Sequence, residues 1–219
     1  MSSIKVSAFC WVPPFAQGQV RDLRVRWALE EVGLSYDQRL LTPATQHSEE
    51  YRSLQPFNQV PSYEEDGMAM FESGAIVLHV AEKSETLCPA DETGKARMTS
   101  WIFAALNSVE PALQNLAAID LFYADQEWAK LRRPGAEQAV LSRLKQLTER
   151  LENRHYLEDR FTAGDLMMAA VLQILRHTDL VARFPVLQAY NERCTSRPAY
   201  RKAHADQMAV FAQNPQPAK

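Results

Sequence analysis

The pattern of apolar and polar positions divides the chain into two parts. Up to about residue 81, short apolar runs typical of strands alternate with stretches in which apolar residues recur at helical spacing. Beyond a polar segment that contains Pro89, only long stretches with helical spacing remain. The sequence therefore predicts an α/β domain at residues 1–83 and an all-helical domain at residues 90–213.

The first part predicts the element order β-α-β-α-β-β-α. The predicted helices begin near Val20, Ser48 and Glu72, and Gly33 is a suitable residue for the end of the first helix. Asp66-Gly67 separates the last two strands and is a strong signal for a two-residue hairpin turn. The strands are expected at residues 4–9, 36–41, 62–65 and 68–71. This is the order of a thioredoxin-like domain, in which a βαβ unit and a terminal hairpin share one sheet.

The second part predicts helices only, at residues 93–118, 126–153, 162–176, 186–195 and 199–211. Thr162 and Asp165 have the spacing of a capping box, in which the hydroxyl and the carboxylate each accept a main-chain N–H. The helix that they begin is apolar nearly all round, which predicts that it is buried. Residues 214–219 carry two prolines and are expected to be disordered.

Composition and charge exclude several classes of function. The 219 residues carry a formal net charge of -3 and no long basic run, which argues against a nucleic-acid partner. No apolar stretch of about 18 residues is present and the first residues lack the pattern of a secretory signal, so we expect a cytoplasmic protein with no membrane partner. Cys10, Cys88 and Cys194 fit neither a disulfide framework nor a zinc site, and the histidines show no metal-ligand spacing, so no metal is expected.

Val60-Pro61 stands directly before the predicted hairpin. A proline next to the start of a strand is sterically allowed, and most bonds before proline are trans. A cis bond would instead turn the chain sharply and direct the main-chain N–H and C=O of Val60 outward. Those two groups could then pair with an extended peptide ligand, in the manner of an added strand. The pattern alone leaves both interpretations open.

Glu72-Ser73 stands at the predicted start of the third helix of the first part. An acid and a hydroxyl at that position can simply cap the helix, which is worth about 1 kcal/mol. The same N–H groups and the positive end of the helix also attract a carboxylate. The Glu72 carboxylate can meanwhile accept a hydrogen bond from an ammonium group. A ligand with an α-amino acid end presents both charges at once.

Taken together and in this order, these motifs resemble the cytosolic glutathione transferases. The stretch Arg24–Glu31 is also similar to that family's first helix, and the resemblance extends from about Lys5 to Phe211. The resemblance implies a thioredoxin-like domain that binds glutathione, an all-helical domain whose capping box is the family's folding motif, and a homodimer. It also implies a transferase that uses glutathione as co-substrate and a small electrophile as its second substrate.

The resemblance assigns roles to individual residues. Pro61 matches the family's cis-proline, and Val60 would pair through its main chain with the cysteinyl part of glutathione. Glu72 and Ser73 would hold the γ-glutamyl end. Gln59, which precedes the Val-Pro pair, would lie near the glycyl carboxylate.

The loop after the first strand departs from the family's pattern. Members lower the pKa of the glutathione thiol with a Tyr or Ser hydroxyl in this loop, or carry a Cys that performs redox chemistry. Residues 9–19 contain neither Ser nor Tyr, and Cys10 is their only nucleophile. Cys10 either faces the site or is a buried apolar residue, in which case Gln17 or nearby main-chain N–H groups must stabilise the thiolate. Trp11 and Phe15 either line an apolar pocket for the electrophile or pack between domains.

Three functions stay open on these grounds. A glutathione transferase acting on a small electrophile is the leading hypothesis. A reactive Cys10 would instead support thiol transfer or reductive deglutathionylation, through a mixed disulfide with glutathione. A protein that keeps this fold but lacks the hydroxyl could also serve as a non-catalytic interaction module.

Overall fold

The chain folds into two compact units that are not the same as its two sequence halves. The structure is a computed structural model that describes residues 3–214 and 216. One unit contains the residues up to Cys88 together with those from Arg197 onward, and the other contains residues 89–196. Apart from Asn214 and Gln216, the tail that was expected to be disordered lies outside the described residues.

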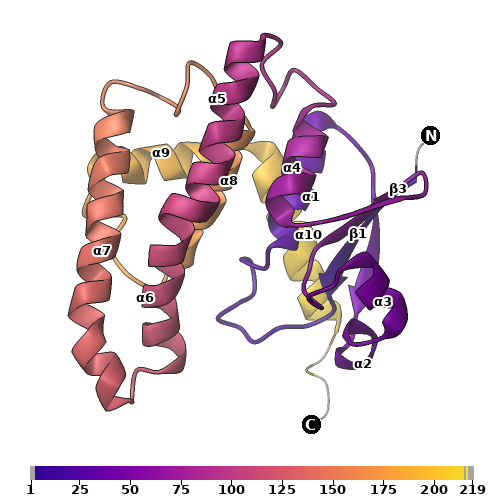
Figure 1. The fold of residues 1–219 in the computed structure, drawn as a ribbon, viewed down its shortest axis with the longest axis horizontal. Coiled ribbons are helices and arrows are strands. Elements are labelled where there is room, and N and C mark those ends of the chain that lie inside the picture. Colours follow the sequence, from indigo (N-terminus) through magenta and orange to yellow (C-terminus); the bar gives the residue numbers. More distant parts are fainter. Residues whose placement is uncertain (1–2, 215, 217–219) are drawn as a thin grey trace. The chain divides into compact units, whose positions relative to one another are not determined.

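A four-stranded mixed sheet forms the centre of the first unit (Figure 1). Its strands lie in the order β2-β1-β3-β4, with β1 parallel to β2 and with β3 antiparallel to both β1 and β4. The strands are β1 Ile4–Phe9, β2 Asp37–Leu41, β3 Ser62–Glu65 and β4 Met68–Phe71. A βαβ unit and a terminal hairpin therefore share one sheet, and the predicted thioredoxin-like fold is confirmed.

The first unit contains the three helices predicted for it and two more, α2 and α10. They are α1 Asp22–Val32, α2 Pro43–Gln46, α3 Glu49–Leu54, α4 Ser73–Ala81 and α10 Pro198–Gln213. Gly33 ends α1 with a φ of 72°, a left-handed conformation that glycine adopts without steric cost. Helix α2 was not predicted; it is a single turn that Thr42 and Thr45 cap reciprocally.

Strand β1 is buried on both faces. Ile4, Val6 and Ala8 lie on one face, since side chains alternate along a strand, and each is at most 3% exposed. Ser7 lies on the other face and is equally buried. Its hydroxyl meets the hydroxyl of Tyr51, which comes from α3. The first unit therefore has packed side chains above and below its sheet.

The last helix, α10, belongs to the first unit because it packs on α1 (Figure 1). The rings of Trp27 and Tyr200 meet edge to face with their centroids 4.8 Å apart. The side-chain amide of Gln207 donates a hydrogen bond of 2.8 Å to the buried carboxylate of Asp22. The sequence analysis placed these residues in a helical domain ending at residue 213, because helical spacing says nothing about the surface on which a helix packs.

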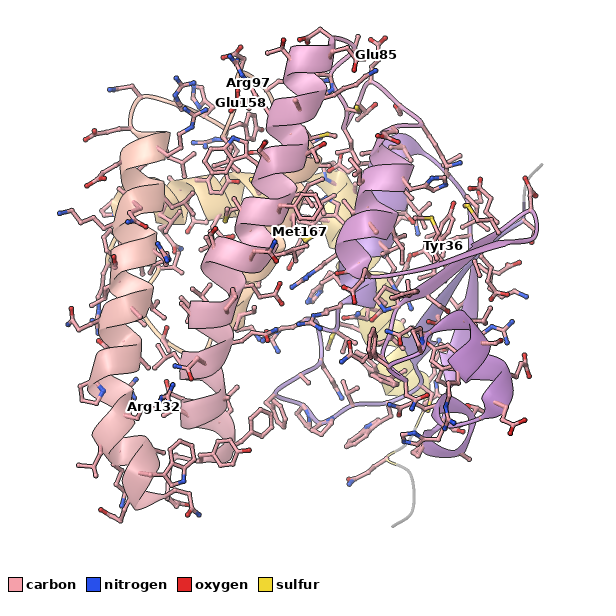
Figure 2. All side chains as sticks on the ribbon, viewed as in Figure 1. Tyr36, Glu85, Arg97, Arg132, Glu158 and Met167 are labelled. Carbon is pink, nitrogen blue, oxygen red and sulfur yellow. The ribbon has the colours of Figure 1, made fainter. Side chains whose placement is uncertain are left out.

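The regular elements of the second unit are all helical among its described residues. Its elements are α5 Glu92–Phe103, a π-helical segment Ala104–Val109, α6 Glu110–Phe122, α7 Glu127–Leu151, α8 Ala163–Leu172, a 3₁₀ turn Gln173–Leu175 and α9 Pro185–Thr195. The predicted helix at residues 93–118 therefore contains a π-helical interruption. Helix α8 is buried over almost its whole length, as predicted, and its Met167 is fully buried (Figure 2).

The predicted capping box is present at the start of α8. The Thr162 hydroxyl accepts the Gly164 N–H at 3.2 Å, and the Asp165 carboxylate accepts the Thr162 N–H at 2.9 Å. The same carboxylate accepts the Leu157 N–H at 2.8 Å and the Tyr190 hydroxyl at 3.1 Å. Burial raises the pKa of Asp165 to about 6, against the lowering effect of these donors.

We expect Asp165→Ala to destabilise the protein by about 3–5 kcal/mol, because it leaves buried donors on Leu157, Thr162 and Tyr190 without an acceptor. Asp91 is the matched control, since it caps α5 through one exposed hydrogen bond to the Gly94 N–H. Asp91→Ala should cost only about 1 kcal/mol. Urea unfolding measures both, and equal losses would contradict the structural role of Asp165.

The Asp165 carboxyl should also make stability depend on pH. Its folded-state pKa of about 6 lies above the ordinary aspartate pKa of about 3.9, so the folded state retains the proton over a range in which the unfolded chain has released it. Relative to Asp165→Asn, the wild-type free energy of unfolding should therefore fall by roughly 2 kcal/mol as the pH rises from 4 to 7. A relative rise over this range would show that the hydrogen bonds to the carboxylate outweigh burial.

Candidate functional site

The hairpin brings two of the predicted site segments together. In the antiparallel pairing of β3 with β4, Ser62 lies opposite Phe71. Pro61 directly precedes Ser62, and Glu72 directly follows Phe71. The same register therefore sets Pro61 opposite Glu72. Opposing residues in an antiparallel pair have Cα atoms about 4.5–5.5 Å apart, so the Val60-Pro61 segment lies next to the start of α4.

The end of β1 reaches the same place. The antiparallel register between β1 and β3, continued past its last pair, sets Phe9 opposite Val60. Phe9 also packs against the small core cluster that contains Val60, Leu41 and Tyr51. The following residue, Cys10, donates its main-chain N–H to the Leu41 carbonyl at 3.0 Å. The loop after β1 therefore begins beside Val60.

The Val60–Pro61 peptide bond is cis, as the resemblance implied. The Val60 side chain is only 6% exposed and is held in the core cluster. Among residues 3–214 and 216, no hydrogen bond reaches the main-chain N–H or C=O of Val60. Main-chain groups at a strand end normally find a partner, so these two are suited to pair with a peptide ligand.

Two side chains that the sequence analysis did not select hold this segment from within. The Tyr51 hydroxyl donates to the Gln59 carbonyl, and the Ser62 N–H donates to the Ser7 hydroxyl at 2.6 Å. The Ser7 and Tyr51 hydroxyls are 2.8 Å apart. Ser7 and Tyr51 are 44 residues apart in the sequence, and no local pattern connects them.

The N-terminus of α4 provides the second part of the site. The first main-chain N–H of the helix to find an acceptor is that of Ile76, which bonds to the Glu72 carbonyl at 3.0 Å. The N–H groups of Ser73, Gly74 and Ala75 have no acceptor within the described part of the chain. Three free donors at the positive end of a nine-residue helix suit a carboxylate.

Glu72 and Ser73 occupy different environments. Glu72 is exposed and makes no capping hydrogen bond, and its backbone has a φ of 70° and a ψ of 113°. Ser73 is 4% exposed, and its hydroxyl accepts a hydrogen bond of 3.3 Å from the buried guanidinium of Arg24. The Ser73 side chain is thus turned toward the interior, while its main-chain N–H is one of the free donors at the N-terminus of α4. Arg24 adds a positive charge behind this end, and the sequence analysis noted it only as part of a helix.

The three side chains selected from the loop after β1 differ in exposure. Cys10 is a free thiol of intermediate burial. Trp11 is half-buried and Phe15 is 43% exposed. All three follow the strand end that lies beside Val60.

Several donors of this loop are engaged within it. The Gln17 side-chain amide donates to the Val12 carbonyl at 3.0 Å. The main-chain N–H groups of Ala16 and Gln17 donate to the carbonyls of Pro13 and Pro14. The loop is therefore a set of consecutive turns, and a thiolate would have to compete with these acceptors for the Gln17 donors.

Two further findings concern metals and membranes. Over the described residues, the side chains of His, Cys, Asp and Glu form no group of three or more that could hold a metal ion. In the same part of the chain, none of the helices has both the length and the apolar character needed to cross a bilayer.

A thioredoxin-like sheet domain with a cis-proline, followed in the sequence by an all-helical unit, is the architecture that the sequence resemblance implied. Residues 16–82 match the family model for the glutathione S-transferase N-terminal domain, and residues 122–198 match the one for the glutathione S-transferase C-terminal domain. The chain belongs to the glutathione S-transferase superfamily.

Its relatives within the superfamily have different named activities. The chain is 26% identical to a maleylacetoacetate isomerase of Rattus norvegicus, over 83% of this chain and 86% of that protein. It is also 26% identical to a glutathione S-transferase of Hyoscyamus muticus, over 83% of this chain and 91% of the relative. The structure is similar to a glutathione transferase from Burkholderia graminis solved with two glutathione molecules per subunit, with a TM-score of 0.80, 25% identity and coverage of 92% and 87% of the two chains.

The backbone of Glu72 allows a direct test of the local geometry. A non-glycine residue with this φ and ψ carries strain of roughly 1–3 kcal/mol, which glycine does not. Glu72→Gly should therefore be more stable than Glu72→Ala by about 1–2 kcal/mol. Ala75 lies in the same helix and is exposed, so the order of Gly and Ala should reverse there. Ala75→Gly should lower the free energy of unfolding by about 1 kcal/mol. Thermal unfolding measures all three variants, and an Ala variant at position 72 as stable as the Gly variant would contradict the strained conformation.

Proposed function

We propose that this protein binds glutathione at the site formed by Val60, Pro61 and the start of α4, and activates its thiol for attack on a small electrophile. The observation that carries the proposal is the set of unpaired main-chain groups there. The Val60 N–H and C=O and the first three N–H groups of α4 lie side by side across one hairpin. They match a ligand that has both a peptide backbone and a carboxylate.

Each part of glutathione finds a complementary group in this proposal. The α-carboxylate of the γ-glutamyl end accepts from the N–H groups at the start of α4, and its ammonium group donates to the exposed Glu72 carboxylate. The cysteinyl main chain pairs with Val60 as a short added strand. Gln59 is exposed next to Val60 and is available to the glycyl carboxylate. Ser73 contributes its N–H and positions the helix end through Arg24.

The chemistry requires the glutathione thiol to lose its proton before its sulfur forms a bond to the electrophilic carbon. The ordinary pKa of a thiol is about 8.5, so a donor near the sulfur must favour the thiolate. We place this donor in the loop after β1, where Cys10 and Gln17 are the candidates, and we assign Trp11 and Phe15 to the electrophile pocket. In a substitution, the leaving group of the electrophile departs with the bonding electron pair. In an addition to a carbon–carbon double bond, the carbon next to the one attacked takes up a proton.

Cys10 supports a second candidate function, because it is a free thiol at the strand end beside Val60. Its thiolate would attack the glutathione sulfur of a mixed disulfide, form a Cys10–glutathione disulfide and release the other thiol. A second glutathione would then attack that disulfide, which frees Cys10 and leaves oxidised glutathione.

We also propose that the protein is a homodimer in the cytoplasm. The support is its membership of the superfamily and the charge and composition of the sequence. Size-exclusion chromatography with light scattering would test the oligomeric state.

Calorimetry with glutathione tests the binding site. Glu72→Gln should weaken glutathione binding about tenfold or more, because it removes a charge-assisted hydrogen bond worth roughly 1.5–3 kcal/mol. Glu82→Gln is the matched control, since Glu82 is an exposed acid at the opposite end of the same helix. It should leave the affinity unchanged. Absence of binding by the wild type, which would favour a non-catalytic interaction module, or equal affinities in the two variants would contradict the site.

A substrate panel separates the two catalytic candidates. An aryl halide, an alkyl halide and an α,β-unsaturated ketone report conjugation, and a glutathionylated peptide reports thiol transfer. A Cys10→Ala variant that keeps conjugation and lacks thiol transfer would assign the two reactions to different groups. A glutathione adduct on Cys10 after exposure to oxidised glutathione, detected by mass spectrometry, would support the thiol-transfer function.

A further inference from the structure

The hydroxyls of Ser7 and Tyr51 form a chain of hydrogen bonds with only one possible direction. At one end the Ser62 N–H can only donate, so Ser7 accepts from it. At the other end the Gln59 carbonyl can only accept, so Tyr51 donates to it. The remaining bond must therefore run from the Ser7 hydroxyl to the Tyr51 oxygen. Ser7 thus accepts from Ser62 and donates to Tyr51, and Tyr51 donates to the Gln59 carbonyl.

The two ends of this chain belong to the peptide units on either side of Val60-Pro61. A trans peptide unit is planar, and its C=O and N–H point in opposite directions. The Gln59 carbonyl shares a unit with the Val60 N–H, and both flanking units are trans, since Val60–Pro61 is the cis bond recorded within the described residues. A Gln59 carbonyl turned inward to Tyr51 thus directs the Val60 N–H away from the interior. In the same way, a Ser62 N–H turned inward to Ser7 directs the Pro61 carbonyl outward.

We propose that Ser7 and Tyr51 are positioning residues for glutathione, which aim the Val60 N–H at the carbonyl of the cysteinyl residue. This inference rests on the proposed function and adds two residues that do not touch the ligand. Tyr51 also holds Val60 by packing, because both side chains belong to the same core cluster. The Val60 main chain is therefore held in place by the packing of its own side chain and by the hydrogen bonds of the peptide units on either side of Val60-Pro61.

Burial makes this chain rigid. Ser7 and Ser62 are 1% exposed and Tyr51 is 2% exposed, so water cannot readily replace any of the bonds. A hydrogen bond on the Gln59 carbonyl also polarises its peptide unit and strengthens the Val60 N–H as a donor. Without the Tyr51 hydroxyl, the carbonyl loses its partner, and the peptide unit is free to rotate toward other acceptors and donors.

The test compares Tyr51→Phe with Tyr63→Phe. Both tyrosines are fully or almost fully buried in the first unit, and each donates one hydrogen bond, that of Tyr63 going to Glu65 at 2.9 Å. Both variants should lose thermal stability, but only Tyr51→Phe should raise the calorimetric Kd for glutathione, by about 5- to 10-fold. In assays with an electrophile that the wild type converts, Tyr51→Phe should raise KM for glutathione by a similar factor. Its kcat at saturating glutathione should stay within about twofold of the wild-type value.

Ser7→Ala provides a second, independent variant. It should also raise the Kd, and the double variant with Tyr51→Phe should bind little worse than either single one, because both break the same chain. In the ligand-free protein, amide exchange of Ser62 should accelerate about tenfold in Ser7→Ala and stay unchanged in Tyr63→Phe. In the wild type, glutathione should shift the Val60 amide resonance, and Tyr51→Phe should reduce this shift at equal ligand concentration.

The outcomes separate this inference from the function on which it rests. Wild-type affinity in Tyr51→Phe, or equal weakening in Tyr51→Phe and Tyr63→Phe, would overturn the positioning role while leaving glutathione binding intact. No heat of binding in the wild type would overturn the proposed function, and the positioning role with it. Slow Ser62 exchange in Ser7→Ala would show that the hydrogen-bond chain itself is wrong.

Discussion

The pairing of β3 with β4 is the constraint on which the candidate site depends. Asp66 and Gly67 form the turn between them with φ values of 47° and 86°, the left-handed conformations of a type I′ turn. A two-residue turn of this type fixes the register, and the register sets Pro61 beside Glu72. Because side chains alternate along a strand, a slip of one residue would set another residue beside Glu72 and would exchange the faces on which the buried Ser62 and Tyr63 lie. The turn, which lies at the far end of the hairpin, thus determines the arrangement of the groups that would hold a ligand.

Much of the fold follows from local sequence signals. The hairpin, the capping box at Thr162–Asp165 and the glycine at the end of α1 each have a short-range physical cause, and the structure contains all three. Helix α2 escaped notice because a single turn capped by two threonines has no apolar periodicity. The membership of α10 in the first unit could not be predicted either, since it depends on side-chain pairs such as Trp27–Tyr200 that are far apart in the sequence.

The candidate site is predictable in its main-chain part and less so in its side chains. Val60-Pro61 and Glu72-Ser73 could be selected from the sequence because the function proposed for them requires specific backbone geometry at a strand start and a helix start. The inward direction of the Ser73 hydroxyl was not predictable, because it results from the buried Arg24. The roles proposed for Cys10 and Gln17 stay predictions, since they depend on where the sulfur of a ligand would lie.

The place of α10 has a consequence for how the protein is made. Ribosomes synthesise the chain from its N-terminus, so all of the second unit emerges before the helix that completes the first. Until then the carboxylate of Asp22 lacks its hydrogen bond from Gln207, and the Arg26 guanidinium that pairs with Asp22 lies on a helix whose outer face is still uncovered. Synthesis of the first unit therefore begins before that of the second and is completed after it.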